Sequence, residues 1–159
     1  MRGEYYWCFF LSVAFFSANA AQINGTPDAN PNKPILERMA QKMVVVVSKD
    51  SEINQLDDKN VANIFLTRTN RYPNGRKAIP IELSGGGLRD DFYQEISGKS
   101  PMELTAYWTT LIFSGRGRPP KGYGEIAALI ERLEKTPNAI SYLSLAQVTE
   151  KLKVVYQFP

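Results

Sequence analysis

Four consecutive valines, Val44 to Val47, constrain the fold of this chain more than any other feature. They lie in the segment MVVVVSK at residues 43–49, and polar residues bound the run on both sides. Side chains branched at Cβ favour extended backbone. A strand that is continuously apolar, instead of alternating with polar residues, is buried on both of its faces. The run therefore predicts an inner strand of a sheet that helices cover on both sides.

Apolar residues at helical and strand spacing recur along the rest of the chain. Helices are expected at residues 35–43, 56–67, 88–98, 100–115, 125–135 and 146–150. Strands are expected at residues 43–49, 77–83, 138–145 and 151–158. This order predicts an α/β domain with a mixed sheet and flanking helices in three layers.

Some boundaries in this pattern carry a specific chemical signal. The start of the helix at 100–115 is marked by a capping box, with Ser100 as N-cap, Pro101 at the first helical position and Glu103 three residues after Ser100. Pro80 cannot donate a backbone hydrogen bond, so the strand at 77–83 is expected near a sheet edge. The segment GRGRPPKGYG at 115–124 is expected to be a long loop because glycine and proline separate its basic residues.

The first 20 residues have the pattern of a secretory signal peptide. Arg2 precedes an apolar run that is short for a membrane span, and Ala18 and Ala20 provide a cleavage site of the A-x-A type. An uncleaved anchor is the alternative. The expected organisation is a signal peptide at 1–20, a flexible leader at 21–34 and a single domain at 35–159. The mature protein is then expected in the periplasm, without a membrane span.

The residues that carry most enzyme chemistry are missing. The chain has no histidine, and its one cysteine, Cys8, lies in the expected signal peptide. This excludes Ser-His-Asp and Cys-His nucleophilic sites and removes the usual zinc ligands. The acidic pairs Asp57–Asp58 and Asp90–Asp91 suit helix starts better than catalysis or a metal site. We expect no enzyme activity, no catalytic residue, no cofactor and no metal; the net charge of +3 is too small and too scattered for nucleic-acid binding.

The segment PIELSGGGLRDDF at 80–92 runs from an expected strand through three glycines into an expected helix. Such a turn presents unpaired backbone N–H groups at the positive end of a helix dipole, which favours an anion. The alternative is that the glycines only permit positive φ in a tight turn. The lysine and hydroxyl residues of a P-loop are missing. The candidate anion ligands are Ser84, Gly85, Gly86, Gly87, Arg89, Arg116 and Arg118.

Several segments together resemble a known family. IFLTRTNRYPNG, FSGRGRPP and PNAISYL, within residues 43–155, are similar to pieces of the small phosphate ABC transporter substrate-binding-like proteins, relatives of periplasmic phosphate-binding proteins. The resemblance implies one lobe of the type II periplasmic binding protein fold. It also implies phosphate or another small anion as ligand.

The resemblance also indicates what has changed in the phosphate loop. The family's Arg-x-x-x-Ser-Gly-Thr motif falls here on Glu82, Gly86, Gly87 and Leu88, so an acid replaces the arginine and both hydroxyl residues are lost. Two functions follow as expectations. One is a non-catalytic periplasmic module with weak small-anion binding. The alternative is an accessory subunit of an envelope assembly that uses the lobe to bind protein partners or a second copy of itself.

Overall fold

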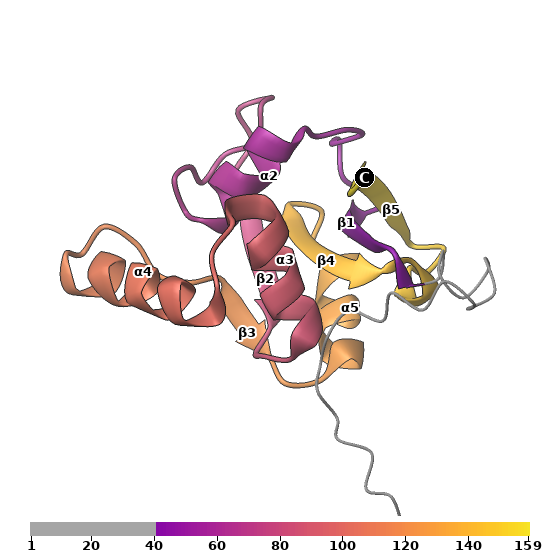
Figure 1. Ribbon diagram of the computed structural model, residues 1–159. Helices are drawn as coiled ribbons and strands as arrows, with labels where there is room; N and C mark the ends of the chain where they lie inside the picture. Colours follow the sequence, from indigo (N-terminus) through magenta and orange to yellow (C-terminus); the bar gives the residue numbers. More distant parts are fainter. Residues whose placement is uncertain (1–40) are drawn as a thin grey trace, which may run out of the picture.

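The computed structural model describes residues 41–159, and Figure 1 shows their arrangement. The signal peptide and leader, and nearly all of the helix expected at 35–43, lie outside these residues. The elements in chain order are β1 (Met43–Ser48), α2 (Asp58–Phe65), β2 (Ile79–Leu83), α3 (Gly87–Ser97), α4 (Pro101–Phe113), β3 (Lys121–Tyr123), α5 (Ile126–Glu134), β4 (Ala139–Ser144), the 3₁₀ turn η1 (Leu145–Gln147) and β5 (Leu152–Gln157).

The five strands form one mixed sheet in the order β3-β2-β4-β1-β5. β2 runs parallel to both β3 and β4, whereas β1 runs antiparallel to both β4 and β5. Val46 of β1 therefore pairs with Ser141 on one side and Val154 on the other. The prediction of an inner strand is confirmed, since Val44 to Val47 are at most 1% exposed.

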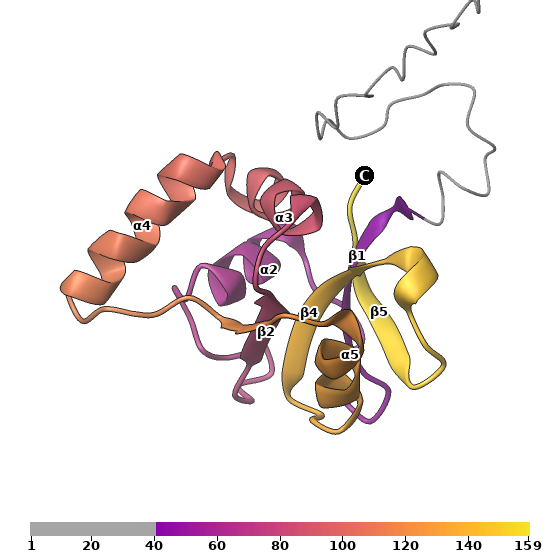
Figure 2. The ribbon, with the colours of Figure 1, turned by 90° about the horizontal axis from the view of Figure 1, so that it is seen from below.

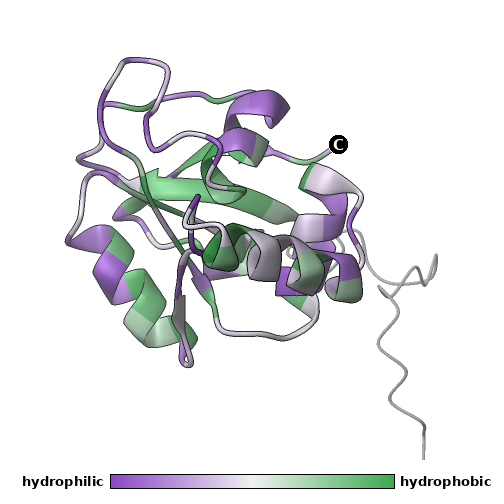
Figure 3. Ribbon diagram, turned by 90° about the vertical axis from the view of Figure 1, so that its left-hand side faces the viewer, coloured by the Kyte–Doolittle hydropathy of each residue, from purple (hydrophilic) through white to green (hydrophobic). Residues whose placement is uncertain are grey.

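The valines of β1 contribute to two hydrophobic cores, one on each face of the sheet. Val45 and Val47 pack in the core beneath α2, α3 and α4, and Val44 and Val46 pack in the core beneath α5. Figure 2 shows α5 on the opposite side of the sheet from α2 and α3. The hydrophobic colour of the inner strands in Figure 3 agrees with burial from both sides. The predicted α/β class with flanking helices is thus confirmed.

β2 lies near the sheet edge, as expected, but it is not the edge strand itself. Residues 121–123 of the segment expected to be a loop form the edge strand β3 next to it. The amide of Ile79 donates to Asn138 on the β4 side, so the nitrogen of Pro80 faces the β3 side. On that side the pairing with β3 begins at Ile81. The sheet therefore needs no backbone hydrogen bond from Pro80.

Capping residues define the helix starts as the sequence predicts. The Ser100 hydroxyl accepts from the Glu103 amide at 3.4 Å, and a Glu103 carboxylate oxygen accepts from the Ser100 amide at 2.9 Å. The Asp57 carboxylate accepts from the Asn60 amide at 2.6 Å and so caps α2. The helix expected at 146–150 is shorter and lies earlier, as η1. Among residues 41–159, every helix is too short or too polar to cross a bilayer.

Candidate functional site

The glycine turn lies between the carboxyl end of β2 and the start of α3, and Ser84 to Gly87 are all exposed. Gly86 is the N-cap of α3, with φ 96° and ψ 166°, a conformation open to glycine and strained for other residues. No side chain caps this helix start. The first amides of a helix have no partner within the helix, so the turn presents backbone donors to solvent, as the sequence predicts.

The acid at the position of the family's arginine is buried beside the turn. Glu82 is 3% exposed. Its carboxylate accepts from the Nε of Arg89 at 3.2 Å and from the hydroxyl of Tyr93 at 2.6 Å. Arg89 is therefore paired inside the protein, with its guanidinium carbon 5.0 Å from the centre of the Tyr93 ring.

Burial dominates the electrostatics of this pair. Desolvation raises the pKa of Glu82, although the hydrogen bond from Tyr93 and the charge of Arg89 act to lower it. For Arg89, burial is the largest single effect and acts to lower the pKa, but the charge of Glu82, the hydrogen bond to Glu82 and the nearby Tyr93 and Tyr142 together raise it. Burial, followed by the charge of Glu82, raises the pKa of Tyr93 far above its ordinary value. Tyr93 is therefore a neutral donor to the carboxylate.

Aromatic side chains fill the interior behind the turn. Phe92 stacks on Tyr142 with ring centres 3.9 Å apart, and it meets Phe65 edge-to-face at 4.6 Å. Phe92, Tyr93 and Tyr142 are fully buried. Any ligand at the turn would bind on the exposed backbone of residues 85–87, because the amide of Ser84 donates to Tyr123, and not among these buried rings.

Arg116 and Arg118 lie away from the turn. They belong to the connection from α4 to β3, where Gly117 packs against Thr67 at the end of α2. Because β2 and β3 are parallel, residues that precede β3 and residues that follow β2 lie at opposite ends of the pair. The structure brings together Ser84 to Gly87 and Arg89, but it does not bring Arg116 and Arg118 to them (Figure 1).

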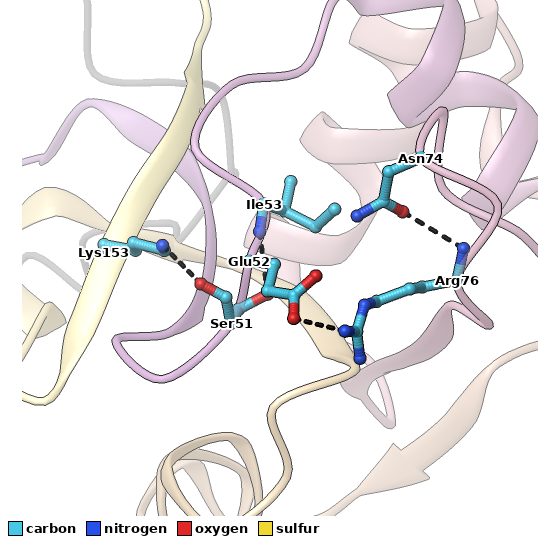
Figure 4. A network of polar contacts seen from close by, with 6 residues as sticks. All are labelled: Ser51, Glu52, Ile53, Asn74, Arg76 and Lys153. Atoms are coloured by element: carbon cyan, nitrogen blue, oxygen red, sulfur yellow. Dashed lines mark hydrogen bonds and ion pairs between the residues drawn. The ribbon is translucent and has the colours of Figure 1, made fainter.

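Arg76, a basic residue that precedes the amino end of β2, has a structural role. Arg76 pairs with Glu52, and its amide donates to the side chain of Asn74 at 3.1 Å (Figure 4). In the same network the ammonium group of Lys153 donates to the carbonyl of Ser51 at 2.6 Å. These contacts hold the turn at 72–76 and the start of β5 against the segment that follows β1. They leave Arg76 engaged by a carboxylate.

The partners of Glu82 were the main feature that sequence reasoning missed. Arg89 and Tyr93 are spaced four residues apart, which places both side chains on one face of a helix. That spacing, with an acid at the end of the preceding strand, was a signal that could have found the network. In the part of the chain that the structure describes, no three acidic, cysteine or histidine side chains cluster to hold a metal.

Comparison with known proteins places the fold. Neither a family model nor a curated protein matches the sequence. Among solved structures, an ABC-type phosphate transport receptor from Vibrio cholerae has a TM-score of 0.56 at 10% identity, with 72% of this chain covered and 45% of that one. A protein from Planctomyces limnophilus, described as a possible phosphate binding protein, has a TM-score of 0.53 at 15% identity, with 72% and 40% covered.

A third structure contains a ligand. It is described as a phosphate ABC transporter substrate-binding protein from Clostridium perfringens with bound phosphate, and it has a TM-score of 0.50 at 19% identity. The match covers 72% of this chain and 44% of the Clostridium perfringens protein. This chain spans less than half the length of each of these proteins. The protein therefore has the fold of one lobe of a type II periplasmic binding protein.

Proposed function

We propose that the protein is a non-catalytic accessory module of the bacterial envelope, in which the glycine turn of a phosphate-binding lobe is kept for folding. The observation that carries this proposal is the pairing of Arg89 with Glu82. The guanidinium of Arg89, which an incoming anion would need, is already paired with the carboxylate of Glu82. The predicted signal peptide at 1–20 supports a periplasmic location.

The charges around the turn also disfavour tight anion capture. Glu82 offsets Arg89, and Asp90 and Asp91 add two carboxylates in the first turns of α3. Charge-assisted bonds from arginine supply the strong part of phosphate recognition. With Arg116 and Arg118 at the other end of β3, the described residues offer a small anion mainly backbone amides.

A second candidate function is weak binding of a small anion at this turn. It is favoured by the exposed glycines and by the absence of a side-chain cap on α3. Such binding would be weak and would discriminate poorly between phosphate and sulfate, because backbone donors alone would carry it.

Isothermal titration of the mature protein with phosphate and sulfate at low ionic strength separates these functions. For the accessory module we expect no saturable heat at millimolar anion. Glu82→Gln should then create measurable phosphate binding, because it releases Arg89. Glu131→Gln is the matched control, since it removes an exposed carboxylate that pairs with Lys135 on α5, away from the glycine turn. Saturable wild-type binding that Gly86→Asp abolishes would overturn the accessory role and establish the anion site.

A further inference from the structure

α4 has two apolar faces on opposite sides. Leu104 and Trp108 face the body of the protein and are at most 6% exposed. The opposite side carries Met102, Ala106, Thr109 and Phe113, spaced by four, three and four residues so that they form one stripe. Met102 is 80% exposed and Phe113 is 88% exposed. This stripe contains no charged residue, and Ile112, 50% exposed, flanks it.

The end of α2 provides an internal comparison for the exposed end of α4. Both helices finish with Ile-Phe and then turn in the same way. The amide of Thr67 donates to Ile64 at 3.1 Å, and the amide of Gly115 donates to Ile112 at 3.1 Å. In α2 the pair Ile64–Phe65 is at most 1% exposed. The exposure of the pair in α4 therefore does not follow from the helix end itself; it follows from the projection of α4 beyond the sheet (Figures 1 and 2).

Basic residues lie at the carboxyl end of this exposed stripe. Lys99, which precedes α4, is instead turned toward the body, with its ammonium nitrogen 5.6 Å from the centre of the ring of Tyr107, whose hydroxyl donates to the carbonyl of Leu66. Arg116 and Arg118 follow α4, and both are exposed. Among the described residues neither arginine has an ion pair. Arg68 adds a further positive charge, since Gly117 packs against its neighbour Thr67.

Negative charge is nearly absent from this side of the molecule. The sequence has no acidic residue from 104 to 124 or from 59 to 81. The one acid of α4, Glu103, is engaged by the amide of Ser100 at 2.9 Å. An apolar stripe that ends in two exposed arginines has the chemistry of a helix that lies in a membrane interface, with apolar groups among the acyl chains and cations at the headgroups.

We propose that the exposed face of α4, defined by Met102, Ala106, Thr109, Ile112 and Phe113, docks on the surface of an anionic lipid bilayer, with Arg116 and Arg118 at the headgroups. This inference goes beyond the proposed function and does not depend on whether the glycine turn binds an anion. It makes the protein peripheral to a membrane, held by one helix face.

Two other occupants fit the face less well. Antiparallel pairing of α4 with the α4 of a second copy would set Met102 opposite Phe113, but it would also set Arg116 opposite Lys99, and like charges repel. A protein partner would need an apolar pocket with acidic walls to receive a projecting helix. A bilayer needs no such shape, because lipids rearrange around an inserted side chain, and each basic residue near an anionic surface strengthens binding by about fivefold.

Vesicle co-sedimentation tests the proposal. The probes are vesicles of phosphatidylcholine alone and of equal parts phosphatidylcholine and phosphatidylglycerol, with the chain as recovered from the periplasm and its N-terminus checked by mass spectrometry. We expect binding to the anionic vesicles that weakens as salt is raised. Phe113→Ser and Arg118→Glu should each lower the partition coefficient by about tenfold. Arg132→Glu, an exposed arginine on α5 across the sheet, should leave it unchanged.

The outcomes that overturn the proposal are distinct from those of the anion titration. Absence of vesicle binding overturns the proposal. Vesicle binding that Phe113→Ser and Arg118→Glu leave intact also overturns it, because such binding would come from a part of the chain that all variants share, such as the N-terminal segment. Association that grows with protein concentration in sedimentation velocity, without lipid, and that Phe113→Ser abolishes would assign the face to a second copy. Phe113→Leu should restore vesicle binding, which separates lost contact from lost folding.

Discussion

The Nε of Arg89 lies 3.2 Å from a carboxylate oxygen of Glu82, across the turn that joins β2 to α3. The arginine belongs to the first turns of the helix, and the acid ends the strand. The pair therefore links the two elements that position the glycine turn. Tyr93 completes the network from the next turn of α3, at 2.6 Å from the second carboxylate oxygen.

Glu82→Gln should change how stability depends on pH. Burial raises the pKa of Glu82. A carboxyl whose pKa is higher in the folded chain than in the unfolded chain stabilises the fold while it is protonated. That contribution is complete below the ordinary glutamate pKa and is lost as pH rises through the raised value. The wild type should thus lose stability relative to Glu82→Gln as pH rises through this window.

Urea unfolding at a series of pH values, followed by circular dichroism, measures this difference. The groups closest to the carboxyl, Arg89, Tyr93 and Tyr142, keep one charge state through the window. Parallel stability profiles for the two proteins would contradict the prediction. A wild type that gains stability with rising pH relative to the variant would mean that the ion pair outweighs burial.

Gly86→Ala should destabilise the protein by about 1–3 kcal/mol, because the N-cap conformation at φ 96° is strained for any residue with a Cβ. Gly87→Ala is the control. It sits next in the chain without positive φ, and its added methyl would meet nothing within 4 Å. Thermal and urea unfolding of both variants measure the contrast. Equal effects would show that the turn can adopt another conformation.

The fold followed from the sequence where local and global signals agreed. The valine run required a strand buried on both faces, and β1 occupies such a position between β4 and β5. The capping box at Ser100 placed the start of α4 because its hydrogen bonds are local. β3 could not be predicted in the same way. Its three residues pair with β2 across about forty positions of chain, and GRGRPPKGYG has turn composition.

The candidate site was predicted in part for a similar reason. The turn conformation at Gly86 depends on a few consecutive residues, and these were found. The expected approach of Arg116 and Arg118 depended on the position of β3 in the sheet, which no local pattern defined. The same missing strand explains why the sequence did not show that another strand lies outside β2. Strand order, more than helix or strand propensity, limited what could be inferred.

Phe65→Ala, at the end of α2, should lower the free energy of unfolding much more than Phe113→Ala, at the end of α4. Phe65 is fully buried, so its truncation should cost about 3–5 kcal/mol. Phe113 is 88% exposed, and its truncation should change stability by less than about 0.5 kcal/mol. Chemical denaturation measures both. A large loss in Phe113→Ala would mean that α4 packs against the body or another chain in solution.

Gly122→Ala should destabilise the edge of the sheet by about 1–3 kcal/mol through overpacking. A methyl group at this position would lie 2.7 Å from the hydroxyl and 3.3 Å from the Cα of Ser84. Gly124→Ala, where nothing lies within 4 Å, is the matched control. Amide exchange at Ser84 reports the local effect, since its amide donates to Tyr123 at 2.9 Å. Unchanged exchange would contradict close packing of β3 on the turn.

The position of β1 sets the order in which the molecule can be completed. β1 is the first strand of the described chain, yet its two neighbours, β4 and β5, are the last two strands. During synthesis the valines have no sheet to join until more than ninety further residues have been made, and the outer side of β1 remains open until Gln157. The sheet around β1 therefore cannot close until residues 139–157 have been made, so that its completion waits for the last strands of the described chain.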